Sequence, residues 1–287
     1  MPGPQSEPET ERSGQPAGPS NLALRILSAA ILAPLALITA YIGDWPFALF
    51  WMLAALAVLW EWIKLIAGPG HVLMFSSCGS AIAVAALVEW RDRPITALLL
   101  VGLGVFASLI FAPRPWQLWI TAGIGYAGAM LLAPMFLRAD PDYGWAALAL
   151  LFAVVWTTDV LGYFIGRLIG GPKLCPAISP KKTWSGAVAG AIGALIAAAV
   201  LAREFGSYNA YAWGGIGLLL SIAAQLGDLL ESWIKRRFGA KDASQLIPGH
   251  GGVMDRLDGF WAAALVACLL GIARGGLHNP GLGLLVW

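Results

Sequence analysis

Long runs of apolar residues, separated by short polar connections, occupy most of the chain after residue 23. A helix needs about 20 apolar residues to cross the ~30 Å hydrocarbon core of a bilayer. The candidate runs lie near residues 24–43, 46–66, 71–89, 95–112, 116–137, 145–168, 185–202, 211–235 and 260–277. The connections carry Pro, Gly or charged residues, as turns between helices do. The pattern predicts an all-α, polytopic integral membrane protein with about nine transmembrane helices.

The composition supports this interpretation and excludes several classes of protein. Of the 287 residues, 59% are hydrophobic and only 12% are charged, about half the charged share of a soluble domain. The net charge of +2 argues against a general basic surface for nucleic acid. The cysteines Cys78, Cys175 and Cys268 lie far apart, which favours neither a disulfide framework nor a zinc site.

The chain divides into three parts. Residues 1–21 are rich in Pro, Gly, Ser and Glu and predict a disordered tail. Residues 22–140 are almost free of ionisable groups inside the spans and predict structural, lipid-facing helices with a candidate surface for dimer contacts. Here Glu61 lies one turn from Lys64, which indicates an interfacial ion pair. Residues 141–287 carry the acidic spans and predict a catalytic transmembrane region.

The distribution of cations predicts the orientation. Of the 18 Lys and Arg residues, all but five fall on the side of the amino-terminal tail. The five on the other side are Arg91, Arg93, Arg138, Arg203 and Arg274. The positive-inside rule therefore predicts a cytoplasmic tail, with both long polar connections on the same side. The expected location is an inner (plasma) membrane of bacterial type.

Two acidic residues lie inside predicted spans at similar depth. Asp159 precedes Arg167 by eight residues and Asp228 precedes Arg237 by nine, which corresponds to roughly 12 and 13 Å at 1.5 Å per residue. A lone membrane carboxylate can be explained by an interhelical ion pair or a bond to a hydroxyl group. Two at one depth favour a water-filled cavity that opens to the cytoplasm.

The connection after the eighth span mixes cations, carboxylates and glycine. Around His250 the chain reads Pro-Gly-His-Gly-Gly, and Asp255 and Asp258 follow. Cations and free backbone N–H groups suit phosphate oxygens, whereas carboxylates suit a hard divalent ion. The alternatives are that Asp258 only caps the ninth span and that His250 is only a hydrogen-bonded loop residue.

A second connection presents hydroxyl groups and lysines just before the seventh span. It reads Ser179-Pro180-Lys181-Lys182-Thr183 and predicts a turn at a helix N-terminus, where anions are attracted. Ordinary positive-inside charge is an equal alternative. In the span that follows, Gly186 and Gly190 lie four residues apart, which predicts close helix packing.

At this point the sequence resembles the phosphatidate cytidylyltransferase family, also called CDP-diacylglycerol synthases. The family signature is matched by Ser232, Lys235, Arg236, Lys241, Asp242, Ile247, Pro248, His250, Gly251, Gly252, Asp255, Arg256 and Asp258. A weaker upstream match comprises Asp159, Tyr163 and residues 179–184. Ser185 departs from the expected pattern and receives no role.

The resemblance implies that CTP and phosphatidate react at the cytoplasmic face to give CDP-diacylglycerol and pyrophosphate, with Mg²⁺ and as a homodimer. It implies that Asp228 and Asp255 are metal ligands. We assign catalytic roles to Asp228, Asp255, Lys235 and Arg256. The expected substrate-binding residues are Asp159, Ser179, Lys182, Thr183, Ser232, Arg236, Lys241, Asp242, His250 and Asp258. Asp159 and Asp258 are also candidate further metal ligands, and a second cation is left open.

Two other functions share these features. Another lipid-phosphate or CDP-lipid transferase would need further Asp residues after Asp258, and the sequence has none. An ion-coupled transporter would place its acids near mid-bilayer with access from both faces, whereas here the polar residues concentrate on one side.

Overall fold

The computed structural model describes residues 21–67, 72–207, 209–247 and 251–287. Its long helices are α1 (Asn21–Ile42), α2 (Asp44–Ala67), α3 (Val72–Trp90), α4 (Pro94–Phe111), α5 (Gln117–Ala139), α6 (Gly144–Ile169), α7 (Trp184–Glu204), α8 (Ala210–Arg237) and α9 (Met254–Gly275). The short elements are β1 (Lys173–Cys175), β2 (Ser179–Thr183) and α10 (Pro280–Leu285). Of the predicted disordered tail, only Asn21 lies within the described residues, and it begins α1.

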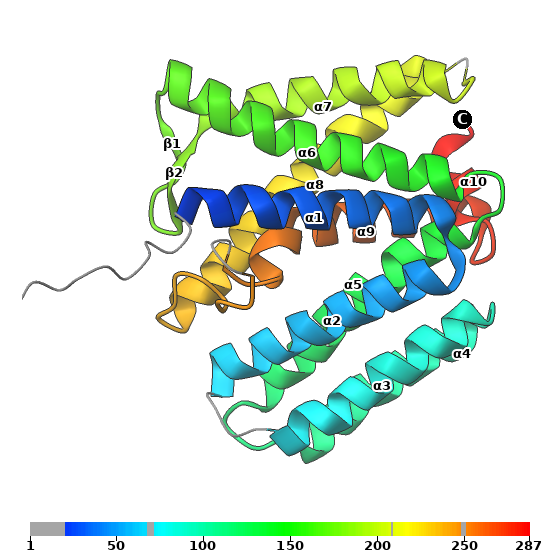
Figure 1. Ribbon diagram of the computed structural model, residues 1–287, viewed down its shortest axis with the longest axis vertical. Helices are drawn as coiled ribbons and strands as arrows, with labels where there is room; N and C mark the ends of the chain where they lie inside the picture. Colours follow the sequence, from blue (N-terminus) through cyan, green and yellow to red (C-terminus); the bar gives the residue numbers. More distant parts are fainter. Residues whose placement is uncertain (1–20, 68–71, 208, 248–250) are drawn as a thin grey trace, which may run out of the picture.

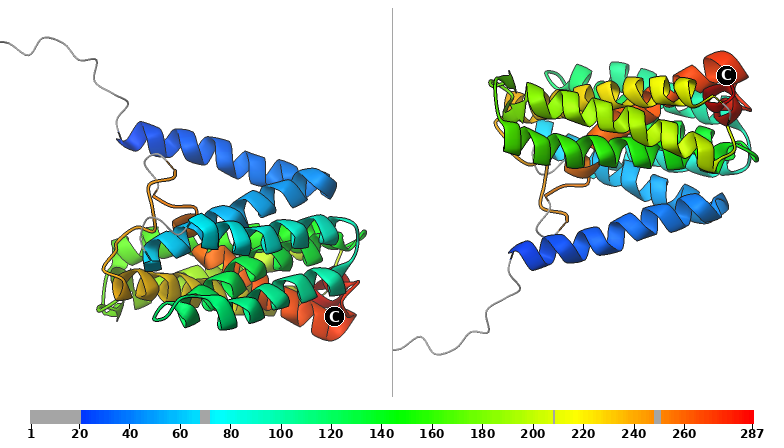
Figure 2. Two further views of the ribbon diagram at one scale, coloured as in Figure 1. Left: turned by 90° about the horizontal axis from the view of Figure 1, so that it is seen from below. Right: turned by 90° about the horizontal axis from the view of Figure 1, so that it is seen from above.

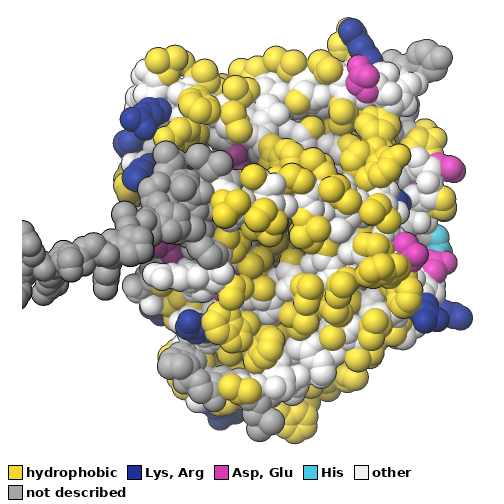
Figure 3. Space-filling view, viewed as in Figure 1, with side chains coloured by type: hydrophobic (Ala, Val, Ile, Leu, Met, Phe, Trp, Pro, Cys, Tyr) yellow, Lys and Arg dark blue, Asp and Glu magenta, His cyan; other side chains and the backbone are white. Residues whose placement is uncertain are grey.

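The prediction of an all-α, polytopic membrane protein is confirmed. Among the described residues, seven helices are long and apolar enough to cross a membrane, and α1 and α3 contribute the shorter apolar stretches Leu27–Ile42 and Met74–Trp90. Each predicted run coincides with one of the long helices, although the count of nine spans stays a prediction. Figure 3 shows a broad hydrophobic face between two ends that carry the charged side chains, as a bilayer requires.

The long helices run between the two ends of the molecule (Figure 1). The β1–β2 hairpin and the connection between α8 and α9 lie at one end, and the carboxy terminus lies at the other. Helix α1 meets α2 at its carboxy-terminal end and diverges from the other helices toward its amino-terminal end (Figure 2). Its side chains Leu27, Ile31 and Ile38 are more than half exposed, which suits contact with lipid.

One buried core joins both halves of the chain. Trp51 of α2 stacks on Phe260 of α9 with ring centroids 5.0 Å apart. Tyr126 of α5 stacks on Trp261 at 4.2 Å, and the Trp261 indole donates to the Tyr126 carbonyl at 3.0 Å. Helices from residues 22–140 therefore position α9 directly.

Helix α9 begins at Met254, well before the predicted start near residue 260. Asp255 and Asp258 consequently lie in its first turns and not in a loop. The polar residues at the start of α9 lowered its local hydropathy, which is why the apolar pattern placed the helix too late.

The close packing predicted from Gly186 and Gly190 is present between α7 and α6. A Cβ atom at Gly186 would lie 2.5 Å from the Gly162 carbonyl oxygen, and one at Gly190 would lie 2.7 Å from the Thr158 carbonyl oxygen. Both contacts are with backbone, which cannot move aside as a side chain can. This close contact fixes the position of α6 against α7, and α6 is the helix that carries Asp159.

We expect Gly186→Ala to lower the melting temperature of the purified protein in detergent, because overpacking costs about 1–3 kcal/mol. Gly215→Ala is the matched control, since a Cβ at this α8 glycine meets nothing within 4 Å. Alanine favours a helix interior by roughly 0.5–1 kcal/mol over glycine, so the control should melt at the same or a higher temperature. Equal melting temperatures for the two variants would contradict the packing argument.

Candidate active site

The β1–β2 hairpin brings Lys182 to α8, where it forms an ion pair with Asp228. Residues 179–183 form strand β2 and not the predicted turn, because β1 pairs with them in antiparallel register. The hairpin is anchored by Thr183, whose buried side chain caps α7 by accepting the Gly186 N–H at 3.2 Å. Both partners of the ion pair are about a quarter exposed.

Lys235 lies at the centre of a second charge cluster, on α8. Its Nζ atom lies 2.5 Å from Oδ1 of Asp255 and 3.0 Å from Oε1 of Glu231. Glu231 is fully buried, and Lys235 is 9% exposed. A buried cation that is hydrogen-bonded to Asp255 and within ion-pair distance of Glu231 holds the start of α9 against the end of α8.

Asp255 also ties the α8–α9 connection (residues 238–253) to the start of α9. Its Oδ2 atom accepts the backbone N–H groups of Ala243 at 2.9 Å and Gly252 at 2.8 Å. With Lys235 on Oδ1, the carboxylate has three donors. Gly251 adopts φ +86° beside it, and a Cβ there would lie 2.9 Å from Oδ2. This turn therefore requires glycine.

The expectation that Glu61 forms an interfacial pair with Lys64 is wrong. Glu61 is fully buried and accepts the backbone N–H groups of Val253 at 2.8 Å and Met254 at 2.7 Å. Its Oε1 atom also accepts the Ser244 hydroxyl at 2.6 Å. Lys64 lies instead over the Trp60 ring, 4.7 Å from its centroid.

The bonds to Glu61 and Asp255 correct a second expectation. The glycine-rich segment was expected to offer free N–H groups to phosphate, yet the N–H groups of Gly252, Val253 and Met254 are bonded to carboxylates. Sequence analysis missed the bonds to Glu61 because Glu61 lies 192 and 193 positions before Val253 and Met254. No signal in the sequence pointed to these donors, because helical spacing favoured Lys64 as the partner of Glu61.

Asp159 and Asp258 complete a group of acids around Asp228. Asp159 is accessible on α6 and interacts electrostatically with Asp228, Lys182 and Arg256. Asp258 interacts with Asp228, Asp159 and Glu231. It does not act as the cap of α9, since it lies within the helix. The acids predicted from separate spans are thus neighbours, and Asp255 joins them through Lys235 and Glu231.

The remaining predicted residues lie around this group. Ser232 donates its hydroxyl to Oδ1 of Asp228 at 3.4 Å. Arg236 is exposed and donates to the Ala240 carbonyl at 3.0 Å. Lys241 and Asp242 are exposed on the α8–α9 connection, and Ser179 is half-buried in β2. His250 lies outside the described residues.

A buried polar network supports the acids from the bundle side. Thr158, next to Asp159, donates its hydroxyl to Ser221 Oγ at 2.7 Å. Gln225, one turn before Asp228, donates to Ser221 Oγ and to the Ala187 carbonyl, both at 3.3 Å. The network links α6, α7 and α8 where they carry the charged side chains.

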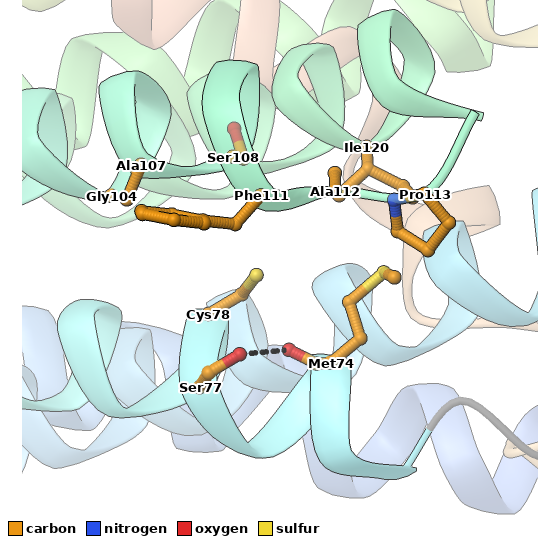
Figure 4. Close-up of a pocket in the computed structure, with 10 residues that line it drawn as sticks. All are labelled: Met74, Ser77, Cys78, Gly104, Ala107, Ser108, Phe111, Ala112, Pro113 and Ile120. Atoms are coloured by element: carbon orange, nitrogen blue, oxygen red, sulfur yellow. Dashed lines mark hydrogen bonds between the residues drawn. The ribbon is translucent and has the colours of Figure 1, made fainter. Parts of the chain in front are cut away.

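Apolar cavities lie along the described part of the helix bundle, and two of them are compared with the acids. One of about 490 Å³ lies between α3 and α4 and is lined by Met74, Cys78 and Phe111 among others; Figure 4 shows their side chains facing one another across it. The other, of about 580 Å³, lies between α1 and α6 and ends at Trp156, one turn from Asp159. Of these two, the second comes within one helical turn of Asp159.

Comparison with known proteins gives a consistent picture. The model of the "Cytidylyltransferase family" matches residues 23–272. The chain is 41% identical over 255 residues to "Phosphatidate cytidylyltransferase" of Brucella abortus biovar 1 (strain 9-941), covering 88% of this chain and 94% of that protein. Proteins of the same name from Rickettsia bellii and Staphylococcus haemolyticus are each 33% identical, covering 83% of this chain and 86% and 94% of theirs.

Proposed function

The chain belongs to the cytidylyltransferase family, and we propose that it transfers the cytidylyl group of CTP to phosphatidate, giving CDP-diacylglycerol and pyrophosphate. The observation that carries this function is the gathering of Asp159, Asp228 and Asp258 with Lys182 and Arg256 inside a membrane bundle. Carboxylates and cations at one place suit a polyphosphate bridged by a divalent ion. Its relatives are named for this reaction.

The lipid substrate needs no general base. The second pKa of a phosphate monoester is near ~6, so the headgroup is largely a dianion at pH 7. The barrier is the approach of two polyanions, which cationic side chains lower by neutralising charge and holding the phosphates in line. Lys241 on the connection and Arg236 in the last turn of α8 are exposed and suit the triphosphate. Lys182 and Arg256 adjoin the acids and suit the phosphates that react.

A divalent cation, Mg²⁺ in our proposal, fits the donor set at Asp228. Mg²⁺ is commonly held by one or two carboxylates, with water and substrate phosphates filling its other positions. Among the described residues no three His, Cys, Asp or Glu side chains form a site by themselves, which suits a metal shared with substrate. Asp228 is about a quarter exposed, is paired with Lys182, and has Asp159 and Asp258 as neighbours. Asp255 would have to exchange Lys235 for the metal. The ion would neutralise charge on the leaving pyrophosphate.

The apolar cavity between α1 and α6 supports a lipid substrate. It is lined by Leu37, Tyr41, Phe152 and Trp156 among others, and it approaches Asp159 within one helical turn. We propose that a hydrocarbon chain of phosphatidate lies along it while the headgroup reaches the acids. CTP would enter from the end that carries the hairpin and the connection, which the positive-inside rule assigns to the cytoplasm.

We also propose a homodimer that is formed through α3 and α4. The apolar stretch of α4 is only 17% buried within one chain, and Leu99, Leu103 and Phe106 are at least 60% exposed. These side chains are available to a second copy in the bilayer. Measurement of the mass of the detergent-solubilised protein by light scattering tests this, and a monomeric mass would contradict it.

The reaction is tested by incubating the purified protein in detergent with labelled CTP, Mg²⁺ and phosphatidate. We expect a lipid-soluble cytidine product that requires both substrates and disappears when a chelator is added. Diacylglycerol in place of phosphatidate is the control, because it lacks the attacking phosphate. A product that forms without phosphatidate would contradict the proposal.

We expect Asp228→Asn and Asp255→Asn each to lose most turnover while the protein still folds and inserts. Asp228→Asn removes charge that would face the cation, and Asp255→Asn also weakens the bonds to Lys235 and Ala243. Initial rates of CDP-lipid formation, measured on the monodisperse gel-filtration fraction, check this. Near-normal turnover by Asp255→Asn would remove Asp255 from the metal assignment.

We expect Lys241→Ala to raise the CTP concentration needed for half-maximal rate, because an exposed cation that contacts the triphosphate contributes mainly to binding. Lys64→Ala is the matched control, since Lys64 is also exposed but lies over Trp60. Rates are measured against CTP at fixed phosphatidate and then the reverse. An unchanged CTP dependence with a weaker phosphatidate dependence would place Lys241 on the lipid.

A further inference from the structure

Glu61 lies on α2, in the part of the chain that sequence analysis treated as structural. Its carboxylate is completely buried and reaches across to the α8–α9 connection. Both of its oxygens accept backbone N–H groups at the start of α9, from Val253 and Met254. The N-terminus of a helix has unpaired N–H groups and partial positive charge, so a carboxylate there is well solvated by the protein.

The same carboxylate also holds the connection at a second point. Ser244 donates its hydroxyl to Oε1 at 2.6 Å, and Gly252 packs so closely that a Cβ there would lie 2.7 Å from both oxygens. Glu61 therefore binds the chain at residue 244 and at residues 253–254. The segment between these points contains the glycine-rich turn.

Asp255 binds the connection at positions adjacent to those of Glu61. Asp255 accepts from Ala243 and Gly252, whereas Glu61 accepts from Ser244, Val253 and Met254. The two carboxylates thus bind the same two stretches of backbone, residues 243–244 and residues 252–254. A shift of either stretch would carry the Asp255 carboxylate away from Lys235, to which it is bonded at 2.5 Å.

We propose that Glu61 is a positioning residue for the cytidylyl transfer, which fixes the α8–α9 connection and through it the carboxylate of Asp255. This role rests on the proposed function. It acts by charge as well as by shape, because the N–H groups of a helix N-terminus bond a carboxylate more strongly than an amide. The helices of residues 22–140 would then take part in the reaction through one side chain.

The decisive variants are Glu61→Gln, which keeps the size and removes the charge, and Glu61→Asp, which keeps the charge and shortens the side chain. The matched control is Glu89→Gln, because Glu89 is another buried carboxylate (5% exposed) on neighbouring α3. Two readouts are taken on the monodisperse protein: amide hydrogen exchange of peptides covering residues 240–256, and kcat and KM for CTP.

For Glu61→Gln we expect exchange in residues 243–254 to rise about 10- to 100-fold, the range expected for loss of hydrogen bonds to a charged group. In Glu61→Gln, exchange in the rest of the protein should match the wild type. In the Glu89→Gln control, exchange in the peptides covering residues 240–256 should also match the wild type. The kcat should fall by a similar factor with little change in KM, as for a group that acts on the transition state. Glu61→Asp should retain more activity than Glu61→Gln.

Three results would overturn the proposal. Wild-type exchange and turnover in Glu61→Gln would show that the contact does not matter. A Glu61→Gln variant more active than Glu61→Asp would mean that size and not charge decides. A rise in exchange over the whole protein, equal in Glu89→Gln, would indicate a general loss of stability. The exchange measurement needs no substrate, so it tests the contact even if the wild-type chain forms no CDP-lipid.

Discussion

The structure depends on how carboxylates are stabilised inside a membrane bundle, which cannot solvate them as water does. A buried charge without a partner costs far more than the few kcal/mol that hold a protein folded. Glu61 is bonded by backbone N–H groups, Asp228 by Lys182 and Asp255 by Lys235 and two N–H groups. Apart from the bond between Gly252 and Asp255, these bonds join different elements of the chain. The need to pair these acids thus brings the hairpin, the connection and three helices to one place.

The acidic and basic side chains of this cluster do not balance in charge. The described side chains of the cluster include five carboxyl groups and three cations: Asp159, Asp228, Glu231, Asp255 and Asp258 against Lys182, Lys235 and Arg256. The excess of acid must be balanced by bound protons or by a cation from outside. A divalent ion carries the charge that is needed, and it is also what two polyanionic substrates require. The same imbalance supports our proposal of a divalent cation at this site.

Sequence patterns predicted those structural features that depend on residues close together in the sequence. Hydropathy located the long helices because each span must be apolar along its own length, and the spacing of Gly186 and Gly190 predicted the close contact with α6. The residues around Lys235 and Asp255 matched the family signature. The partner of Glu61 could not be predicted in this way, because helical spacing pointed to Lys64 while the real donors lie beyond residue 240. Tertiary pairing decided the role of this side chain.

The division of the chain at residue 140 separates regions of different composition. Contacts beside the candidate active site nevertheless join the two regions. Trp119 of α5 packs against Trp233 and Phe238 at the end of α8, with ring centroids 6.0 and 4.9 Å apart. Glu61 holds the start of α9 from α2. An active-site carboxylate must be held to a fraction of an ångström to work in a transition state, and a glycine-rich connection is too free to do so alone. In our proposal the helices of residues 22–140 supply that rigidity, so the site carried by residues 141–287 is precise only within the whole bundle.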